Sequence, residues 1–372
     1  MKKNKILYIV STLSQSGPTN QLLNIIRNLD LEYFEPIVLT LSSEPTESLK
    51  YKYDELNIKV VTLALNRIEG IFKSKALLID KIHEIQPSII HTQGLRADSL
   101  LSKINLDIPW LMTSRNYPYE DYPMKFGQLK GRLMAYIHLA AMVRCNNVIA
   151  CSKTISNALV KHNIKAYSIQ NGVDNEAVAS GADINLPELE RPIFISVGSL
   201  IPRKNMDFII DAFNVYSKNH SGSLIILGNG PEFNRLKKKA NSQKVFMQGS
   251  VSNVIRYLSH SDYFLSSSLS EGLPNTVLEG LNAGLPSLLS DIPSHKEIAM
   301  ETPSCVSIFK LNNGVEALAE NLASVKELLP EVSHENAKIL ARTVFSASSM
   351  SNKYQSLYKE LIKNQKVEKI VL

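Results

Sequence analysis

The feature that most constrains this 372-residue chain is a regular alternation of short β-rich runs with longer helical patterns. KILYIVS, EPIVLTL and SIIHT in the first half, and IFISVGS and SLIILGN in the second, each precede a segment with helical apolar spacing. This alternation predicts parallel sheets covered by helices, because parallel neighbours are joined by crossover helices. We therefore expect an α/β fold made of doubly wound, Rossmann-like units.

The alternation occurs in two blocks separated by an irregular stretch. Residues 1–173 are expected to form a first α/β domain and residues 191–345 a second one. Residues 174–190 are polar, contain Gly and Pro and lack a clear apolar period, so they are expected to be the linker. The last helical pattern lies in residues 346–372 and could cap either domain, including by a return to the first.

The predicted strands are the apolar, β-rich runs of each block. Those of the first domain lie at 5–11, 35–41, 58–65, 88–92, 109–114, 147–151 and 166–170, and those of the second at 193–199, 223–229, 244–250, 262–268, 286–290 and 305–310. A helix is expected from about Thr19 and another near residues 126–144. In such sheets ligands bind at the carboxyl ends of the strands.

Composition limits the class of protein. A hydrophobic content of 44% and this length allow two domain cores of ordinary size. The formal net charge of +6 falls short of the dense basic surface of a nucleic-acid binder, so no nucleic-acid partner is expected, whereas a polyanionic ligand or an anionic membrane is compatible. Three cysteines without a Cys-x-x-Cys pair favour a reducing compartment and roles as buried small hydrophobic residues.

The amino terminus, MKKNKILYIVSTL, has a basic start and a short apolar run, but polar residues follow without a signal-peptide cleavage site. We interpret it as a first strand. No stretch approaches the roughly 18 uninterrupted apolar residues of a membrane span. A cytoplasmic location is expected, with any membrane contact peripheral, on the inner face of the plasma membrane.

The most informative block is SSSLSEGLPNTVLEGLNAGLPSLLSD, residues 266–291. It leaves a strand, passes through a Gly-Leu-Pro turn and enters a helix, with Pro274 expected at the first helical position. Backbone amides after Glu271 would then lie at a helix amino terminus, which is an anion site. Glu279 lies about one turn further into the same helix.

Arg203 and Lys204, in VGSLIPRKN, follow a strand that ends near Gly198, again at a carboxyl end. Two adjacent cations can neutralise a diphosphate, Arg through its fork of donors and Lys as a point charge. Together with two carboxylates that can accept hydrogen bonds from sugar hydroxyls, they fit a nucleotide sugar. Taken singly, each feature also has a purely structural explanation. A Glu at a helix start interacts favourably with the helix macrodipole, and an Arg-Lys pair in a loop is often merely solvated.

Glu271 and Glu279, in S-E-G-L-P-N-T-V-L-E, resemble the paired-glutamate motif of the family 4 retaining glycosyltransferases. The resemblance covers most of the chain, including VGSLIPRKNMDFIIDAF, LIILGNGPE and SIQNGVD, and is stronger in the second half. It implies the GT-B fold, in which two Rossmann-like domains face a central cleft. It also implies an enzyme of the hexosyltransferase type, of the kind that assembles bacterial cell-surface polysaccharides.

The resemblance implies roles residue by residue. Arg203 and Lys204 are expected to bind the donor diphosphate and stabilise the leaving group. Glu271 is expected to hold hydroxyls of the donor sugar, and Glu279 the ribose. Arg203, Lys204 and Glu271 are the catalytic candidates, in the sense of transition-state stabilisers. The other donor-binding candidates are Gly17, Gly198, Gly228, Met247, Gln248, Gly272, Leu273, Pro274, Asn275 and Thr276.

The first domain contains the acceptor-side candidates. The loop at residues 11–20 includes Gln15, Gly17 and Thr19. The resemblance implies Gly-Gly in this loop, with amides that approach the donor phosphates or the acceptor. This chain has Gly17-Pro18, so one amide donor is lost.

His91 and Arg115 are predicted at the carboxyl ends of two strands, where this architecture places function. Many members of the family that this chain resembles have a His in the region of Arg115, contacting donor sugar or acceptor. An Arg is cationic at all relevant pH values, so Arg115 could hold a phosphate or an acidic acceptor but could hardly act as a base. A lone strand-end histidine such as His91 is also typical of a purely structural role.

Between Tyr122 and Gly172 the chain has no Asp or Glu but several Lys and Arg residues. Within this stretch MKFGQLKGRLMAYIHLAAMVR, residues 124–144, has a helical pattern with basic residues beside a large apolar face. This pattern is typical of peripheral binding to anionic lipid and equally typical of a core-facing helix with a basic edge.

The sequence has no Asp-x-Asp pair and no His/Cys/Asp cluster with metal-ligand spacing, so neither a metal nor another cofactor is predicted. Charge on the departing diphosphate is expected to be met by Arg203, Lys204 and helix-terminus amides. The hypothesis is a retaining transferase that moves a sugar from a nucleotide sugar, with UDP favoured, to a lipid-linked saccharide in O-antigen or capsule assembly. A sugar-nucleotide epimerase, a phosphorylase and a non-catalytic sugar-nucleotide-binding protein remain alternatives.

Overall fold

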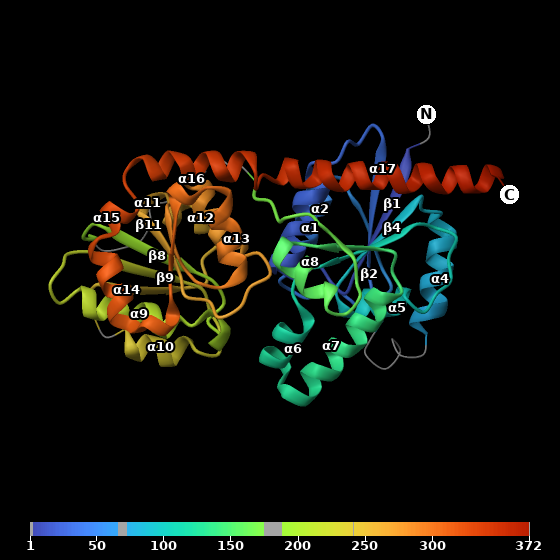
Figure 1. Ribbon diagram of the computed structural model, residues 1–372. Helices are drawn as coiled ribbons and strands as arrows, with labels where there is room; N and C mark the ends of the chain where they lie inside the picture. The colour runs from blue at the N-terminus through green and yellow to red at the C-terminus, as the bar shows by residue number, and fades with distance from the viewer. Residues whose placement is uncertain (1–2, 66–72, 175–187, 241, 372) are drawn as a thin grey trace. The chain divides into compact units, whose positions relative to one another are not determined.

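The structure is a computed structural model that describes residues 3–65, 73–174, 188–240 and 242–371. The chain forms two compact units (Figure 1): Met1–Gly172 together with Ala347–Leu372, and Val173–Ser346. The expected first domain ends at residue 173 and the expected second domain at 345; the second unit also includes residues 174–190, which the sequence analysis assigns to a linker. Most of the expected linker, residues 175–187, falls outside the described residues.

The first unit is built on a seven-stranded sheet. Its strands are β1 (Asn4–Val10), β2 (Phe34–Thr40), β3 (Lys59–Thr62), β4 (Ile89–Gln93), β5 (Trp110–Ser114), β6 (Asn147–Ala150) and β7 (Ala166–Ser168). All neighbours pair in parallel, in the order β3-β2-β1-β4-β5-β6-β7. The chain changes its direction of travel across the sheet between β1 and β4, which is the switch point where doubly wound sheets bind ligands.

Helices cover this sheet (Figure 1). They are α1 (Gly17–Arg27), α2 (Lys50–Glu55), α4 (Ser74–Ile85), α5 (Leu95–Leu101), α6 (Pro118–Phe126), α7 (Gln128–Val143), α8 (Lys153–Val160) and α17 (Ala347–Val371). Residues 124–144, predicted as one helix, are divided between α6 and α7. The break lies at Gly127, whose φ of 83° is a left-handed conformation that ends α6 and that only glycine adopts without strain.

Helices α6 and α7 pack on each other as a hairpin that extends away from the sheet of the first unit (Figure 1). A buried polar triad holds it in place. His138 of α7 is 2.8 Å from the Asp98 carboxylate of α5 through Nε2, and its Nδ1 is 2.8 Å from the Tyr122 hydroxyl of α6. The hairpin is therefore fixed to α5 by side chains from three helices.

The second unit repeats the same plan with a six-stranded sheet. Its strands are β8 (Ile193–Val197), β9 (Ser223–Leu227), β10 (Val245–Gly249), β11 (Tyr263–Ser266), β12 (Ser287–Ser290) and β13 (Val306–Phe309). All neighbours again pair in parallel, in the order β10-β9-β8-β11-β12-β13, with the switch point between β8 and β11. Every predicted strand run overlaps one of these thirteen strands, and the prediction of two doubly wound α/β domains is confirmed.

The helical segments of the second unit follow its strands, as the sequence alternation predicts. They are η1 (Pro202–Lys204), α9 (Met206–Tyr216), α10 (Phe233–Lys239), α11 (Val254–His260), α12 (Asn275–Asn282), α13 (Pro293–Glu301), η2 (Pro303–Cys305), η3 (Leu311–Asn313), α14 (Gly314–Ala323), α15 (Val325–Leu328) and α16 (Val332–Thr343). The core of this unit gathers apolar residues from β8, β9, α9 and α14.

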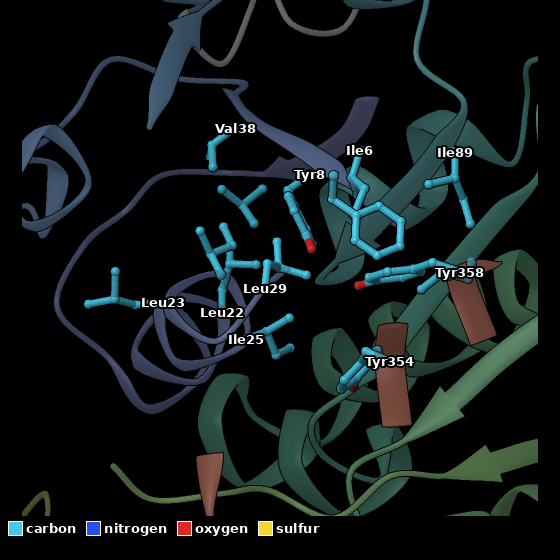
Figure 2. Packing of buried hydrophobic residues seen from close by; sticks show 14 of the residues in the cluster. Ile6, Tyr8, Leu22, Leu23, Ile25, Leu29, Val38, Ile89, Tyr354 and Tyr358 are labelled. Atoms are coloured by element: carbon cyan, nitrogen blue, oxygen red, sulfur yellow. The ribbon is translucent and has the colours of Figure 1, made fainter. Parts of the chain in front are cut away.

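The last helix, α17, returns to the first unit and completes its core. Figure 2 shows Tyr354 and Tyr358 of α17 near Tyr8 of β1, Ile25 of α1 and Ile89 of β4. The Tyr8 and Tyr358 rings meet edge to face with centroids 6.4 Å apart. Of the two options that the sequence left open for the final helix, the structure therefore has it capping the first domain.

Candidate active site

The catalytic candidates meet at the switch point of the second sheet. β8 and β11 are neighbours in this sheet, and the loops that follow them carry Arg203 with Lys204 and Glu271 respectively. The Arg203 Nη1 atom lies 2.7 Å from Glu271 Oε2, and the Lys204 Nζ atom lies 2.6 Å from Glu271 Oε1. Glu271 comes nearly seventy positions after the adjacent Arg203 and Lys204 in the sequence, and the structure brings all three together.

Burial and charge act in opposite directions on Glu271, whose side chain is only 7% exposed. Burial alone would raise the pKa of its carboxyl, but the adjacent Lys204 and Arg203 outweigh it and lower the pKa to about 2. Glu271 is therefore ionised at every physiological pH. Ser268 Oγ also donates to its Oε1 at 2.8 Å, so Oε2 retains the greater capacity to accept a further hydrogen bond, for example from a sugar hydroxyl.

Backbone contacts fix the two loops against each other. Leu269 N donates to Arg203 O at 2.8 Å, and Ser267 Oγ donates to Asn205 O at 2.7 Å. Arg203 Nη1 also donates to the carbonyl of Ser270. The cations and the carboxylate are therefore held by rigid connections and need little rearrangement to meet a ligand.

The segment after Glu271 leads into α12. The prediction that Pro274 occupies the first helical position is wrong by one residue: Pro274 is the N-cap, with an extended ψ of 106°, and Asn275 begins the helix. Gly272 and Leu273 form the preceding turn, Thr276 lies in the first turn, and that turn contains no acidic residue. An anion approaching this helix end meets no acidic repulsion from its first turn.

Glu279 lies on α12, half-buried, one turn beyond Asn275 and Thr276. Residues three and four apart share one face of a helix, so Glu279 lies on the same face as these two first-turn residues. The neighbouring Gly280 packs α12 onto the sheet, because a Cβ there would lie 2.7 Å from the Phe264 ring. This close packing fixes the position of α12 and hence of Glu279.

The other predicted donor-binding residues lie directly after β8 and β9 and within β10. A Cβ on Gly198 would lie 3.2 Å from Lys204 Cε, so Gly198 borders the Lys204 side chain directly. A Cβ on Gly228 would lie 1.9 Å from the Gly198 carbonyl oxygen, which leaves room only for glycine. On β10, Gln248 is the extra residue of a β-bulge that follows Met247, a feature that redirects side chains near binding sites.

His295 of α13 is a part of this site that the sequence analysis missed. It is fully buried; its Nδ1 is 2.9 Å from Ser290 O, and its Nε2 is 3.5 Å from the hydroxyl of Ser266, which in turn is 3.3 Å from Ser268 Oγ. Burial lowers the pKa of His295 to about 4, although the charge of Glu271 opposes this. The neutral imidazole of His295 is thus connected to the Glu271 carboxylate through Ser266 and Ser268. No motif marks this histidine in the sequence.

In the first unit, the predicted phosphate loop begins α1. Gly17 is its first residue, and Pro18 occupies the second position, where the absence of an N–H leaves no intrahelical bond unmade. Thr19 is buried; its Oγ1 accepts from Ser16 N at 3.1 Å and donates to Ser14 O at 2.6 Å. Thr19 therefore closes the loop on itself, whereas the acceptor-side candidate Gln15 is exposed.

His91 lies in the core and not on an open strand end. Its Nδ1 is 2.7 Å from the Tyr358 hydroxyl, its Nε2 is 2.8 Å from Thr113 Oγ1, and its ring stacks on Tyr354. Burial, and then the charge of Arg115, lower the pKa of His91 well below its ordinary value. Both ring nitrogens of His91 are hydrogen-bonded in the core. This geometry favours a role for His91 in attaching α17 to the sheet over a role in contacting an acceptor.

Arg115 follows β5, where the sequence predicts it. Its Nε donates to Gln93 Oε1 at 3.3 Å, and its Nη1 donates to Asn171 Oδ1 at 2.7 Å. Both partners are neutral amides that the sequence analysis did not single out. The cation is therefore oriented by the carboxyl end of β4 and by the loop after β7.

Three further observations concern what the described residues contain. The three cysteines are buried thiols, as predicted. No group of three or more His, Cys, Asp or Glu side chains among these residues is placed to hold a metal ion. Within the same ranges, no helix combines the length and apolar character needed to cross a membrane.

Family models match both halves of the chain. Residues 16–177 match the model described as Glycosyltransferase Family 4, and residues 180–338 match the one described as Glycosyl transferases group 1. Among curated proteins, the chain is 25% identical to the O-antigen biosynthesis glycosyltransferase WclY of Escherichia coli, over 96% of this chain and 99% of WclY.

A second relative matches over a shorter range. The UDP-Gal:alpha-D-GlcNAc-diphosphoundecaprenol alpha-1,3-galactosyltransferase of Escherichia coli is 30% identical over 146 residues, which are 35% of this chain and 37% of that enzyme. Both relatives are glycosyltransferases by name, and WclY is matched almost from end to end.

Solved structures confirm the architecture. The sucrose-phosphate synthase of Thermosynechococcus elongatus superposes with a TM-score of 0.81 at 15% identity, covering 97% of this chain and all of that one. HepE of Anabaena in complex with UDP-glucose gives a TM-score of 0.75 at 15% identity, covering 96% and 99%. The fold is the two-domain GT-B fold. The chain is a glycosyltransferase of the hexosyltransferase type, and it belongs to the glycosyltransferases that have a Glycosyltransferase Family 4 domain followed by a Glycosyl transferases group 1 domain.

Proposed function

We propose that this enzyme moves a sugar from a UDP-sugar donor to a lipid-linked saccharide acceptor during O-antigen or capsule assembly, with retention of configuration and without a metal. The observation that carries the proposal is the ion-paired cluster of Arg203, Lys204 and Glu271 at the switch point of the second sheet. WclY, named for O-antigen biosynthesis, and the galactosyltransferase, named for a diphosphoundecaprenol-linked acceptor, support the pathway and the acceptor class.

The cluster suits departure of a nucleoside diphosphate. When the bond between the sugar anomeric carbon and the diphosphate oxygen breaks, negative charge accumulates on that oxygen. Arg203 and Lys204 lie within ion-pair distance of Glu271, so both cations are already oriented, and the α12 amino terminus adds backbone dipoles. The acceptor oxygen bonds to the anomeric carbon, and its proton passes to the departing phosphate on the same face.

Donor recognition is proposed to use the loops around the cations. Glu271 Oε2 accepts from a sugar hydroxyl, and Glu279 accepts from the ribose. Gly198, Gly228 and the bulge residue Gln248 border the nucleotide. The fold shared with HepE, whose structure holds UDP-glucose, and the name of the galactosyltransferase support UDP as the nucleotide.

The direct test incubates the purified full chain with a panel of nucleotide sugars and membrane lipid extracts, and detects products by mass spectrometry. We expect transfer from a UDP-sugar in the presence of EDTA, and a loss of about 100-fold or more in Arg203→Ala and Glu271→Ala. Arg235→Ala, which removes an exposed cation paired with Asp207, is the control and is expected to retain activity. Unchanged transfer in the first two variants, or transfer abolished by EDTA, would contradict the corresponding part of the proposal.

We also propose that the α6–α7 hairpin binds anionic membrane from the cytoplasmic side. Its outward face exposes large apolar side chains, with Leu129 90% exposed near the tip. Basic residues of the same hairpin lie on exposed positions beside them, and Lys125 and Lys130 lie over the Phe126 ring. The exposed apolar residues are Met124, Phe126, Leu129, Leu133, Tyr136, Ile137 and Val143. Apolar residues rimmed by cations match the chemistry of an anionic bilayer surface.

Vesicle flotation tests this surface. We expect the full chain to bind vesicles of phosphatidylglycerol and phosphatidylcholine but not vesicles of phosphatidylcholine alone. Leu129→Glu with Leu133→Glu is expected to abolish binding, since two carboxylates replace two exposed apolar contacts of the hairpin. Met300→Glu, at an apolar position of the second unit whose exposure of 79% lies between those of Leu129 and Leu133, is the matched control. Binding that survives the double substitution would exclude the hairpin as the membrane contact.

A further inference from the structure

Four polar side chains form a row on one face of the first sheet, at the carboxyl ends of β4 and β5. Side chains two residues apart in a strand point to the same face, so His91 and Gln93 lie together on β4. On β5, Thr113 bonds to His91, and Arg115, two residues further, bonds to Gln93. The buried part of the row, His91 and Thr113, packs against α17. Gln93 and Arg115 are its outer end.

The guanidinium at this end has a positive charge that no carboxylate in the described part of the chain balances. Both hydrogen-bond acceptors of Arg115, Gln93 Oε1 and Asn171 Oδ1, are neutral amide oxygens. Among the described residues Arg115 forms no ion pair. A half-buried cation without a counter-ion is destabilising in the folded protein unless a ligand supplies the negative charge.

Two N–H groups remain available at the same place. Arg115 Nη2 and Gln93 Nε2 are both buried, and neither has a hydrogen-bond partner among the described residues. Gln93 is only 7% exposed. The orientation of its amide is fixed by chemistry: the oxygen must face the donor Arg115 Nε, so the NH2 group is the unpartnered one. Buried donors without acceptors are rare in folded proteins, and they indicate a place where a ligand binds.

The second amide is held in place from behind. Asn171 precedes Gly172, whose two backbone groups both bond to the side-chain amide of Gln21 in α1. Gln21 Nε2 donates to Gly172 O at 2.8 Å, and Gly172 N donates to Gln21 Oε1 at 3.1 Å. Asn24 Nδ2 adds a further bond to Gly172 O at 3.1 Å. Two amides therefore hold Nε and Nη1 of the Arg115 guanidinium in place. Nη2, its third nitrogen, bonds to neither amide.

We propose that Arg115 and Gln93 form an anion subsite that binds an oxo-acid group of the acceptor, either a phosphate of its lipid-linked diphosphate or a sugar carboxylate. Arg115 Nη2 and Gln93 Nε2 donate one hydrogen bond each to the two oxygens of that group, and the Arg115 charge balances it. Neutral acceptors of the same saccharide are discriminated against. This inference rests on the proposed glycosyl transfer and names the acceptor class for it.

The binding test uses the full chain with UDP at saturating concentration, so that the donor site is filled. Inorganic pyrophosphate and glucuronate are titrated separately at constant ionic strength, and binding is measured by calorimetry. We expect at least one of the two to bind, and to bind about 10- to 100-fold more weakly to Arg115→Gln. Binding of pyrophosphate but not glucuronate would identify the acceptor diphosphate as the bound anion. Binding of glucuronate but not pyrophosphate would identify an acidic sugar.

A second variant separates ligand binding from folding. Gln93→Glu places a carboxylate beside the guanidinium, so the subsite neutralises itself and binding is lost while the melting temperature stays the same or rises. Lys59→Gln, at an exposed position of β3, removes the same charge as Arg115→Gln and is expected to bind like the unmodified chain. Equal binding of both probes by the unmodified chain, Arg115→Gln and Gln93→Glu, or binding of neither probe by any of them, would overturn the subsite.

The catalytic arm distinguishes this inference from the proposed function. With the same saccharide offered on a polyprenyl diphosphate and on a neutral alkyl chain, Arg115→Gln is expected to raise KM for the first by about tenfold and leave KM for the second unchanged. If no donor is turned over by any form of the enzyme, the proposed function fails, and the subsite is then judged by the binding measurements alone.

Discussion

The carboxyl of Glu271 is stabilised in its ionised form by two neighbouring cations, and this has a consequence for folding. Its pKa of about 2 in the folded chain lies below its ordinary value of 4.5, so folding favours the ionised form. The resulting stabilisation is fully present above about pH 4.5 and is lost as the pH falls toward 2. We expect Glu271→Gln to lower the free energy of unfolding by on the order of 3 kcal/mol at pH 7, measured by urea denaturation.

The difference between the two proteins should narrow below pH 4.5, because the unmodified carboxyl then begins to lose its advantage. Asp54→Asn is the control, since Asp54 forms an exposed pair with Lys50 that contributes less than about 1 kcal/mol. A stability gap that stays constant down to pH 3.5 would show that the ion pairs do not stabilise the fold.

His295 gives a second prediction, over a different range of pH. Its pKa of about 4 in the folded chain lies below its ordinary value of 6.5, so the unfolded chain takes up the proton first. The unmodified chain should lose stability as the pH falls from 6.5 to 4. His295→Gln, which keeps a side-chain amide among Ser266 and Ser290, is expected to flatten this slope by about 3 kcal/mol in total. An unchanged slope in urea titrations would contradict it.

The sequence identified residues when a motif or a strand end marked them. Arg203, Lys204 and Glu271 were found because each follows a predictable strand, and the structure joins them by ion pairs. Gln93 and His295 could not be found, because their roles depend on which strands become neighbours and on which amide oxygen faces a cation. Those facts arise only from tertiary packing.

At the scale of elements, the α6–α7 hairpin depends on one close approach. A Cβ on Gly131 of α7 would lie 2.4 Å from the backbone carbonyl oxygen of Tyr122 in α6. Gly131→Ala is expected to separate the helices, at a cost of about 1–3 kcal/mol that exceeds the gain in helix propensity. Faster hydrogen exchange in α6 would report the separation. Arg132→Ala, at the next and exposed position, should leave exchange unchanged.

Predictability at this scale followed the strength of the local signal. Every strand was found because parallel strands are continuous apolar runs between turn residues. The break at Gly127 was missed, because an isolated glycine in a helical pattern is often tolerated. Whether the final helix belonged to the first or second unit was left open, because its apolar period does not encode which sheet it covers.

For the whole molecule, the return of α17 to the first unit makes that unit discontinuous in sequence. We expect a chain that ends at Ser346 to lose the cooperative unfolding of the first unit. Its core would lose Tyr354, Tyr358 and the apolar residues around them, on the order of 10 kcal/mol, which is comparable to the stability of a domain. Trp110, the single tryptophan, lies on β5 of this unit and reports its state by fluorescence.

A chain that ends at Gln365 is the control, because it keeps the buried residues of α17 as far as Ile362. It should unfold like the full chain. If the chain ending at Ser346 keeps the Trp110 fluorescence of the full chain and a single sharp transition, α17 contributes little to the first core.

This connectivity also determines the order of events during synthesis. Domains usually fold as they leave the ribosome, the amino-terminal one first. Here the residues that fill the first core through Tyr354 and Tyr358 are made after the whole second unit. The nascent first unit must therefore wait, with an apolar surface exposed, until α17 has been translated. In this protein the second unit, which carries Arg203, Lys204 and Glu271, can be finished before the first.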